Sequence, residues 1–401
     1  MEHFAAVQSI IRAALSEDRD ALDKQIARLR DRLAKDGHTR EAETIDRLRL
    51  SARDTQSMAP SRVEVSRALV TGETLAMGIN PPIDRETGAR LCSIDFPSST
   101  QKMPVHSGAV LATLEELLME WSQSAALSSV GVEPTRTVLI YGPPGSGKTV
   151  TAHHIAQRLN LPLVTARIDG LISSFLGTTS RNIANLFDFV NRYACILLLD
   201  EFDALAKLRD DPQEIGEIKR VVNTLLQNLD LRRNYGVTIA ITNHDRLLDP
   251  AVWRRFETHV QIGEPGSEAR EQLIRRFLLP IDPPHSTLQV FSYCLAGRSG
   301  ADIERLCLAV KRTLALSGNA IDGPGLFHAL ASILARTPHH DHLPARILAA
   351  DQEAFVSLIA NDAELPMKQT EIGEATGYGQ SRVSDLKRAR RHLQLIEASH
   401  A

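Results

Sequence analysis

The spacing of apolar residues changes along the chain and separates regions of different predicted structure. Up to residue 50, apolar side chains recur three or four positions apart. This is the period of an amphipathic helix, so we predict a helical N-terminal domain over 1–55. Residues 56–105 show no clear period and contain several prolines, which predicts a linker that can contain short strands.

Short apolar runs of strand length begin after Pro134 and alternate with helical stretches. The runs are TVLIYG, LPLVTARI, CILLLD and GVTIAITN. This alternation predicts an α/β fold with a parallel sheet covered by helices on both faces. We assign residues 106–263 to this α/β domain, 264–335 to a helical domain and 336–401 to a small C-terminal domain.

Composition narrows the class of protein. The 401 residues carry a formal charge of −3, with 43% hydrophobic and 24% charged residues. These values are ordinary for a globular protein and argue against a surface that coats nucleic acid throughout. The four cysteines form no C-x-x-C pair, so neither a zinc site nor a disulfide framework is predicted. The acidic N-terminus does not resemble a signal peptide, and no apolar run is long enough to span a membrane. We expect a cytoplasmic protein.

Residues 142–149 read GPPGSGKT, which fits the phosphate-loop pattern G-x-x-x-x-G-K-[ST]. A strand-like run precedes it and a helical stretch follows, as the motif requires. Backbone N–H groups of such a loop turn inward around phosphate, and the helix N-terminus attracts anions. The predicted ATP-binding residues are Gly142, Pro143, Pro144, Gly145, Ser146, Gly147, Lys148, Thr149 and Val150. We expect Lys148 to reach the β- and γ-phosphates and Thr149 to bind Mg²⁺.

A pair of carboxylates follows the third apolar run, in CILLLDEFD. Ligands of open α/β sheets bind at the carboxyl ends of the strands, where Asp200 and Glu201 are expected. We predict that Asp200 holds Mg²⁺ and that Glu201 is the general base for water.

Several segments in this order resemble the AAA ATPase family: GPPGSGKT, LLLDEFDAL, EIKRVVNTLLQNLD, AITNHDRLLDPAVWRRFE and GRSGADIERL. The resemblance runs from the phosphate loop to about residue 310. It implies a P-loop NTPase fold with a helical lid, ATP hydrolysis with Mg²⁺, and assembly into homohexameric rings.

The resemblance also implies roles for further residues. Asn243 matches the polar residue that helps to position the attacking water. Arg254 and Arg255 match the arginine fingers, which reach the γ-phosphate bound by the neighbouring subunit. Gly300 and Ala301 match the start of the lid helix over the nucleotide. The WRRF form of the finger segment leaves open which of the two arginines dominates.

The segment LISSFLGTTS carries an aromatic, an aliphatic and a glycine residue in a predicted loop. In the AAA family a loop of this kind points into the central pore of the ring. The resemblance implies that Phe175 and Leu176 grip an extended polypeptide and that Gly177 permits the tight loop. The alternative is that Phe175 packs on its own domain.

The C-terminal segment MKQTEIGEATGYGQSRVSDLKRARR has the glycine and apolar spacing of a helix-turn-helix. Its second predicted helix carries basic residues that are candidates for DNA contact. They are Arg382, Lys387, Arg388, Arg390 and Arg391. The alternative is a protein-contact module or an extension of the lid with a solvated basic face.

The leading functional hypothesis is an ATP-driven ring that remodels or threads a protein substrate. The layout also resembles stand-alone bacterial AAA ATPases, some of which are paired with a subtilisin-like serine protease in phage defence. The sequence contains neither H-E-x-x-H nor G-x-S-x-G, so any protease would be a separate partner. The alternatives are an ATP-regulated DNA-binding assembly and a nucleotide-gated scaffold.

Overall fold

The structure of the chain is a computed structural model. It describes residues 26, 28–30, 33, 69–98, 103–171, 176–203, 215–317, 321–337, 342–363 and 365–399. For 169–170, 176–177, 215–220, 247 and 390–399 it describes the backbone alone. The chain divides into a unit of residues 1–62 and a unit of residues 63–401. The N-terminal helices predicted over 1–55 lie almost wholly outside the described residues.

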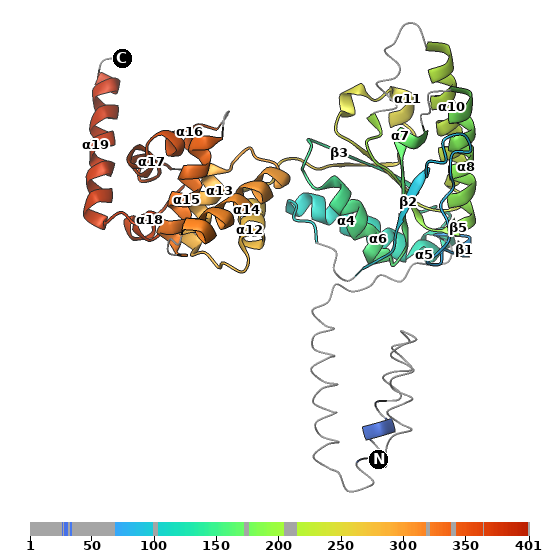
Figure 1. The fold of residues 1–401 in the computed structure, drawn as a ribbon, viewed down its shortest axis with the longest axis horizontal. Helices are drawn as coiled ribbons and strands as arrows, with labels where there is room; N and C mark the ends of the chain where they lie inside the picture. Colours follow the sequence, from blue (N-terminus) through green and yellow to red (C-terminus); the bar gives the residue numbers. More distant parts are fainter. Residues whose placement is uncertain are drawn as a thin grey trace. The chain divides into compact units, whose positions relative to one another are not determined.

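A six-stranded sheet with the order β2-β4-β6-β7-β3-β8 forms the centre of the second unit (Figure 1). All neighbouring strands are parallel except β2, which pairs antiparallel with β4 at one edge. The strands are β2 (Cys92–Asp95), β3 (Thr137–Tyr141), β4 (Leu163–Ala166), β6 (Ile196–Leu199), β7 (Thr238–Thr242) and β8 (Thr258–Gln261). The predicted α/β fold with a parallel sheet is confirmed.

Helices cover both faces of this sheet, because the strands carry apolar side chains on both faces. In β3, Val138 and Ile140 belong to one core cluster and Leu139 to the other. Helices α4 and α6 supply the first cluster, and α8 and α10 supply the second (Figure 1). The helices of this part are α4 (Gly108–Ser122), α5 (Ser124–Ser129), α6 (Lys148–Leu159), α7 (Ile168–Leu171), α8 (Leu176–Arg192), α10 (Ile215–Arg232), η2 (Asp245–Leu247) and α11 (Pro250–Trp253).

The segment 56–105, predicted as a linker that can contain short strands, has two such strands where the structure describes it. It contains β1 (Glu73–Thr74), which pairs with β5 (Tyr193–Ala194), and the edge strand β2. Leu91 and Cys92 are fully buried against the sheet. The alternation of a four-residue edge strand between prolines is too short to fix its bounds from the sequence.

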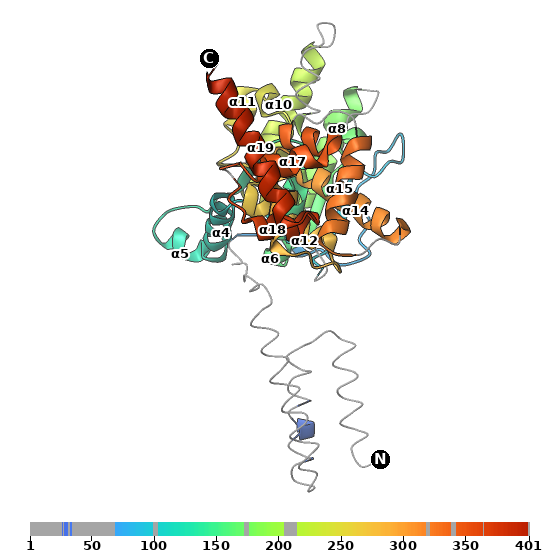
Figure 2. The same cartoon turned by 90° about the vertical axis from the view of Figure 1, so that its left-hand side faces the viewer.

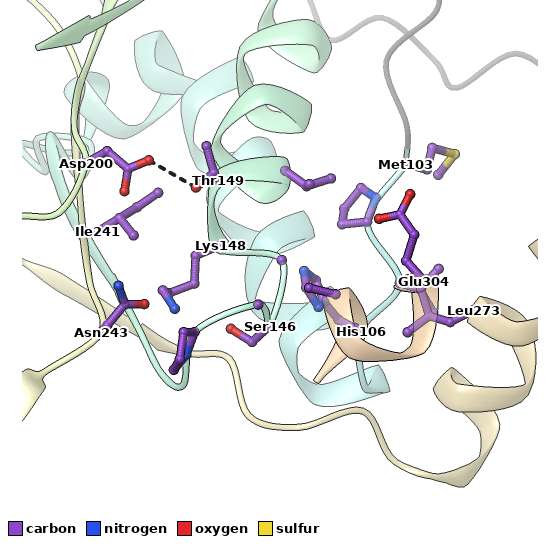
Figure 3. Close-up of a pocket in the computed structure, with 18 of the residues that line it drawn as sticks. Met103, His106, Ser146, Lys148, Thr149, Asp200, Ile241, Asn243, Leu273 and Glu304 are labelled. Atoms are coloured by element: carbon purple, nitrogen blue, oxygen red, sulfur yellow. Dashed lines mark hydrogen bonds between the residues drawn. The ribbon is translucent and has the colours of Figure 1, made fainter. Parts of the chain in front are cut away.

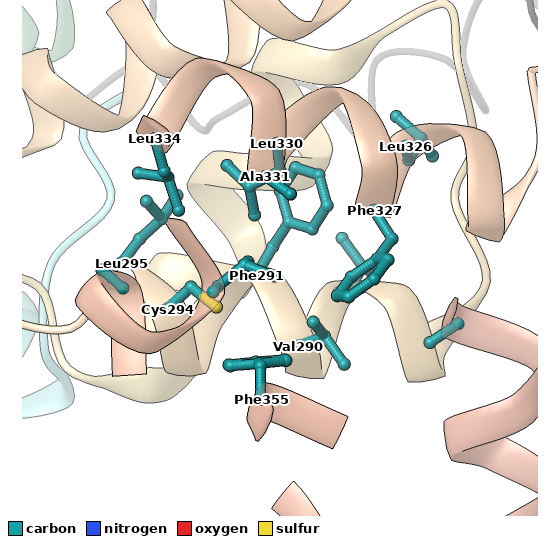
Figure 4. Packing of buried hydrophobic residues seen from close by; sticks show 14 of the residues in the cluster. Val290, Phe291, Cys294, Leu295, Leu326, Phe327, Leu330, Ala331, Leu334 and Phe355 are labelled. Carbon is teal, nitrogen blue, oxygen red and sulfur yellow. The ribbon is translucent and has the colours of Figure 1, made fainter. Parts of the chain in front are cut away.

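Eight further helices of the described chain follow the sheet and share one hydrophobic cluster. Figure 4 shows the part of it around Phe291, Phe327 and Phe355. This cluster extends from Leu273 to Val383 and includes Phe291, Phe327 and Phe355. The helices are α12 (Ser267–Leu278), α13 (His285–Cys294), α14 (Gly300–Ser317), α15 (Gly323–Arg336), α16 (Leu343–Ala350), α17 (Gln352–Ile359), α18 (Gln369–Thr376) and α19 (Gln380–Ser399). The predicted boundary near residue 335 therefore does not coincide with a break in the core.

Helices α18 and α19 are joined by a turn at Gly377, which has a left-handed φ of +82°. Helix α18 packs on α13 and α15, and α19 packs on α17 (Figure 2). A Cβ atom at Gly323 would lie 2.6 Å from the carbonyl oxygen of Glu374, so α15 and α18 approach closely. Among the described helices, none has the length and apolar character needed to cross a membrane.

Candidate functional site

A cavity of about 390 Å³ lies at the carboxyl edge of the central sheet (Figure 3). The phosphate loop, the residues that follow β6 and β7, and helices α12 and α14 all contribute to its walls. Asp200, Ile241 and Asn243 lie on one side of it, and Met103, Leu273 and Glu304 lie on the other. Strand β7 lies between β6 and β3, so Asn243 follows a strand between the phosphate loop and the acidic pair.

The glycines of the phosphate loop have backbone conformations that side chains disfavour. The φ values of Gly142, Gly145 and Gly147 are +146°, +74° and +96°. A Cβ atom on Gly142 would lie 1.9 Å from the carbonyl oxygen of Ile262. Glycine therefore permits both the turn after β3 and the start of α6 at Lys148.

Lys148 is buried, and its ammonium group donates hydrogen bonds within its own loop. Nζ lies 2.9 Å from the carbonyl oxygen of Gly142 and 2.7 Å from that of Pro143. Burial lowers the pKa of Lys148, and the charges of Asp200 and Asp203 oppose this shift. A phosphate oxygen in the cavity would give the ammonium group a charged partner in place of these carbonyls.

Asp200 connects the end of β6 to the start of α6. Its Oδ2 accepts a hydrogen bond from Thr149 Oγ1 at 3.1 Å, and its Oδ1 accepts one from Glu201 N at 2.9 Å. Glu201 is exposed and has a φ of +52°, a conformation that a non-glycine residue seldom adopts. The Thr149 and Asp200 oxygens are hard donors, so the pair fits Mg²⁺.

Asp203 is a buried carboxylate beside the site. Its contact with Thr242 was not predicted from the sequence. It is 5% exposed, and its Oδ1 accepts a hydrogen bond from Thr242 Oγ1 at 3.3 Å. Thr242 Oγ1 in turn accepts from the backbone N–H of His244 at 3.0 Å. These bonds fix the backbone on both sides of Asn243, so they help to hold its side chain at the cavity.

The first residues of α14 contact the phosphate loop. The N–H of Ala301 donates to the carbonyl oxygen of Gly145 at 3.1 Å, and both Gly300 and Ala301 line the cavity. From Pro144 to Val150 the phosphate loop also lines the cavity, whereas Gly142 and Pro143 contact Lys148 behind it. The structure thus brings the predicted lid residues to the predicted phosphate loop.

Arg254 and Arg255 do not line this cavity. Both are exposed at the end of α11, and Arg255 forms an ion pair of 3.3 Å with Asp230. Two predicted site residues are therefore separate from the nucleotide site of their own chain.

Residues Met103, His106 and Arg276 line the cavity but were not predicted from the sequence. Met103 lies in the segment predicted as a linker, His106 is the first residue assigned to the α/β domain and precedes α4, and Arg276 lies on α12 among other charged residues. Neither motif nor periodicity marks them, because they reach the site only through tertiary packing.

The structure describes only some of the predicted pore and DNA-contact residues. Phe175 lies outside the described residues, and Leu176 and Gly177 open α8 with the backbone alone described. Arg382 is exposed and donates to both carboxylate oxygens of Glu353, at 2.7 and 2.8 Å. Lys387 is half-buried and Arg388 is exposed on α19, where Arg390 and Arg391 are described in backbone only.

The model of the "ATPase family associated with various cellular activities (AAA)" matches residues 138–264. This span contains the phosphate loop, the acidic pair, Asn243 and both arginines. The chain carries an AAA ATPase domain. Its residues 138–264 are called the AAA domain below.

Relatives of the AAA domain come from bacteria, archaea and a mammal. An uncharacterised AAA family ATPase of Sinorhizobium fredii is 39% identical over 53% of this chain and 64% of its own length. A nuclear valosin-containing protein-like protein of Mus musculus is 34% identical over 49% of this chain and 24% of its own length. The proteasome-activating nucleotidase of Methanopyrus kandleri is 33% identical over 44% of this chain and 43% of its own length. The chain thus spans less than two thirds of each of these relatives.

Proposed function

We propose that this chain hydrolyses ATP with Mg²⁺, assembles into a homohexameric ring and uses the energy to remodel or thread a protein substrate. One observation supports the proposed assembly into a ring. Arg254 and Arg255 lie outside the cavity that is lined by Lys148, Asp200 and Glu201. Arg276 lines the cavity but donates to the carbonyl oxygen of Met103. In this proposal Arg254 and Arg255 therefore offset the charge of the transition state in the cavity of a neighbouring copy.

Different residues of the cavity bind the phosphates, the metal ion and the lid in this proposal. Backbone N–H groups of the phosphate loop and Lys148 bind and orient the phosphates. Thr149 and Asp200 would hold Mg²⁺, which would offset the charge of the phosphate oxygens. Gly300 and Ala301 position the lid over the loop, so that closure would exclude water that is not reacting.

Glu201 and Asn243 act on the attacking water in this proposal. Glu201 accepts a proton from the water as the water oxygen attacks the γ-phosphorus and the bond to the ADP oxygen breaks. Asn243 orients the water from the neighbouring strand. The bonds of Asp200 and Asp203 support this arrangement, because they fix the backbone at the ends of β6 and β7.

The proposed protein substrate rests on the pore-loop resemblance of Phe175, Leu176 and Gly177 and on the relatives. One relative is named as a proteasome-activating nucleotidase. A separate protease that receives the substrate, such as the subtilisin-like serine protease of phage-defence pairs, is a further proposal based on the resemblance alone.

The test is a trapping experiment with Glu201→Gln, which should bind ATP and fail to hydrolyse it. The variant is loaded with ATP and Mg²⁺, and the retained polypeptides are identified by mass spectrometry. A retained polypeptide that is lost with Glu201→Gln/Phe175→Ala supports threading. The matched control is Leu316→Ala, which removes a side chain that is 89% exposed on α14. Retention that Phe175→Ala leaves unchanged would contradict a pore contact.

The alternative proposal, ATP-regulated DNA binding through α19, has less support. Arg382 already donates to both oxygens of Glu353, so a phosphate would have to compete with a carboxylate for it. Salt-dependent binding to duplex DNA that Arg388→Glu abolishes would favour this alternative. Absence of DNA binding at low salt would exclude it.

A further inference from the structure

The segment Met103–His106, called the strap below, crosses the nucleotide cavity before α4 begins. All four of its residues line the cavity, and it contacts two different parts of the site. The carbonyl oxygen of Met103 accepts a hydrogen bond from Arg276 Nη1 of α12. The side chain of Val105 packs against the cluster formed by helices α12 to α19. The strap is therefore attached to the helical part of the chain, whose helices α12 and α14 line the cavity.

His106 attaches the other end of the strap to the phosphate loop. Its Nε2 lies 2.7 Å from Thr151 Oγ1, which is fully buried on α6. Thr151 Oγ1 donates to the carbonyl oxygen of Gly147 at 3.0 Å. A hydroxyl has one hydrogen to donate, so both bonds form together only when Nε2 of His106 carries the proton.

The ring of His106 also lies directly beside Gly147. A Cβ atom placed on Gly147 would be 3.4 Å from Cε1 of His106. Gly147 has a φ of +96° and precedes Lys148 and Thr149, the two side chains predicted to contact phosphate and Mg²⁺. The position of the imidazole ring thus affects the backbone from which both side chains project.

Neutral His106 suits this role. Burial, together with the nearby charge of His154, lowers the pKa of His106 to about 4. The ring therefore has one N–H at neutral pH, and the bond to Thr151 places it on Nε2. A protonated ring would instead put a second cation close to Lys148 at the phosphate loop.

We infer that His106 is a positioning residue for the phosphate loop and that the strap makes nucleotide affinity depend on the lid helix α12. This inference rests on the proposed nucleotide site and adds a residue that transmits contacts between its two walls. It requires no contact between His106 and the nucleotide.

The test measures the Kd of full-length protein for mant-ADP and mant-ATP in the presence of Mg²⁺. Loss of one hydrogen bond to a buried group predicts that His106→Ala raises both Kd values by about tenfold. Both nucleotides should be affected equally, because Gly147 lies at the loop rather than at the γ-phosphate. His106→Gln should restore most of the affinity, since its side-chain amide can also donate to Thr151. A Kd for His106→Ala equal to that of the wild type would refute the inference.

Further variants separate positioning from a general loss of stability. Thr151→Val keeps the side-chain volume and removes the hydroxyl, so it should raise Kd as His106→Ala does. Ile155→Val, at a fully buried residue of the same helix, should lower thermal stability and leave both Kd values within about twofold. Wild-type affinity in Thr151→Val, or weakened binding in Ile155→Val, would contradict a specific effect of His106.

A double-mutant cycle tests whether the strap acts as one unit. Arg276→Ala releases Met103 and should also weaken binding. If the strap couples the two walls, His106→Ala/Arg276→Ala loses little more affinity than either single variant. If the factors by which the two single substitutions raise Kd simply multiply in the double variant, the coupling to α12 is refuted. Failure of the wild type itself to bind mant-nucleotide, with Lys148→Ala no weaker, would instead refute the proposed function.

Discussion

Thr149 Oγ1 and Asp200 Oδ2 are 3.1 Å apart, although 51 positions separate them in the sequence. Two neighbouring ligands of an octahedral Mg²⁺, each about 2.0–2.1 Å from the ion, are also about 3 Å from one another. The two oxygens thus already have the spacing that the ion requires, and Asp200 is fixed further by the N–H of Glu201.

Asp200→Asn should therefore change the dependence of hydrolysis on Mg²⁺. We expect the Mg²⁺ concentration for half-maximal phosphate release to rise by more than about tenfold. The measurement is phosphate release during a Mg²⁺ titration at fixed ATP. Asp95→Asn, at an exposed residue of β2, is the matched control and should leave the titration unchanged. An unchanged titration in Asp200→Asn would show that Asp200 is not a ligand.

Arg254→Ala and Arg255→Ala should each leave nucleotide affinity within about twofold, because neither residue lines the cavity of its own chain. The variant that removes the dominant finger should lose about 10³-fold in kcat. Mixing that variant with Glu201→Gln should restore part of the activity, because intact arginines of one copy would then face intact carboxylates of another. No activity in any mixture would contradict an arginine supplied between copies.

Arg246→Ala is the control for this experiment, since it removes another exposed arginine of the same region. It should leave both kcat and nucleotide affinity unchanged. The ion pair of Arg255 with Asp230 is exposed, and such pairs contribute little to stability. Loss of activity in Arg255→Ala together with full activity in Asp230→Asn would therefore assign the effect to the arginine and not to the pair.

Acid should destabilise the wild type partly through His106. Its pKa is about 4 in the folded chain, against 6.5 for an unperturbed histidine. Between these two pH values the unfolded chain binds more protons, so the free energy of unfolding falls as pH falls through this window. The slope from one proton is at most about 1.4 kcal/mol per pH unit, and solvent screening of the half-buried ring reduces it.

The measurement is thermal and urea unfolding of the wild type and of His106→Gln between pH 7 and pH 4. The variant should lose less stability than the wild type as pH falls, and the two curves should run parallel above about pH 6.5. His154 also has a lowered pKa, so some acid sensitivity remains in the variant. Parallel curves down to pH 4 would contradict the assignment to His106.

Gly142→Ala and Gly263→Ala form a matched pair of substitutions just after the neighbouring strands β3 and β8. A Cβ on Gly142 would meet the carbonyl of Ile262 at 1.9 Å, and its φ is +146°. Strain and overpacking predict a loss of about 3 kcal/mol in the free energy of unfolding, together with loss of nucleotide binding. A Cβ on Gly263 would meet nothing within 4 Å, so its variant should stay within about 0.5 kcal/mol of the wild type. Chemical denaturation followed by mant-ADP binding measures both effects.

The parts of the site that the sequence predicted well are those encoded locally. The phosphate loop lies between a buried strand and a helix, and each of these has a period that can be recognised. Asp200 and Asn243 follow apolar runs, so the carboxyl edge of a parallel sheet was their expected place. The structure places both beside the phosphate loop.

The strap and the buried Asp203 could not be predicted in the same way. His106 lies 45 positions before Thr151, and Asp203 lies 39 positions before Thr242. These contacts depend on the order of the strands and on the approach of the lid, and neither leaves a spacing in the sequence. For a related reason, the sequence left the core shared by α12 to α19 as an alternative, in which the C-terminal segment extends the lid. Amphipathic helices show which face is apolar but do not show which helix covers it.

This shared core has a mechanical consequence. Phe355 and Val383 pack in the same cluster as Leu273, which also lines the nucleotide cavity. Close-packed interiors deform little, so a rotation of α12 on nucleotide exchange would turn α19 through the same angle. The orientation of α19 would then depend on the state of the nucleotide site. A partner bound to α19 would then be moved by each cycle of ATP hydrolysis without contacting the nucleotide.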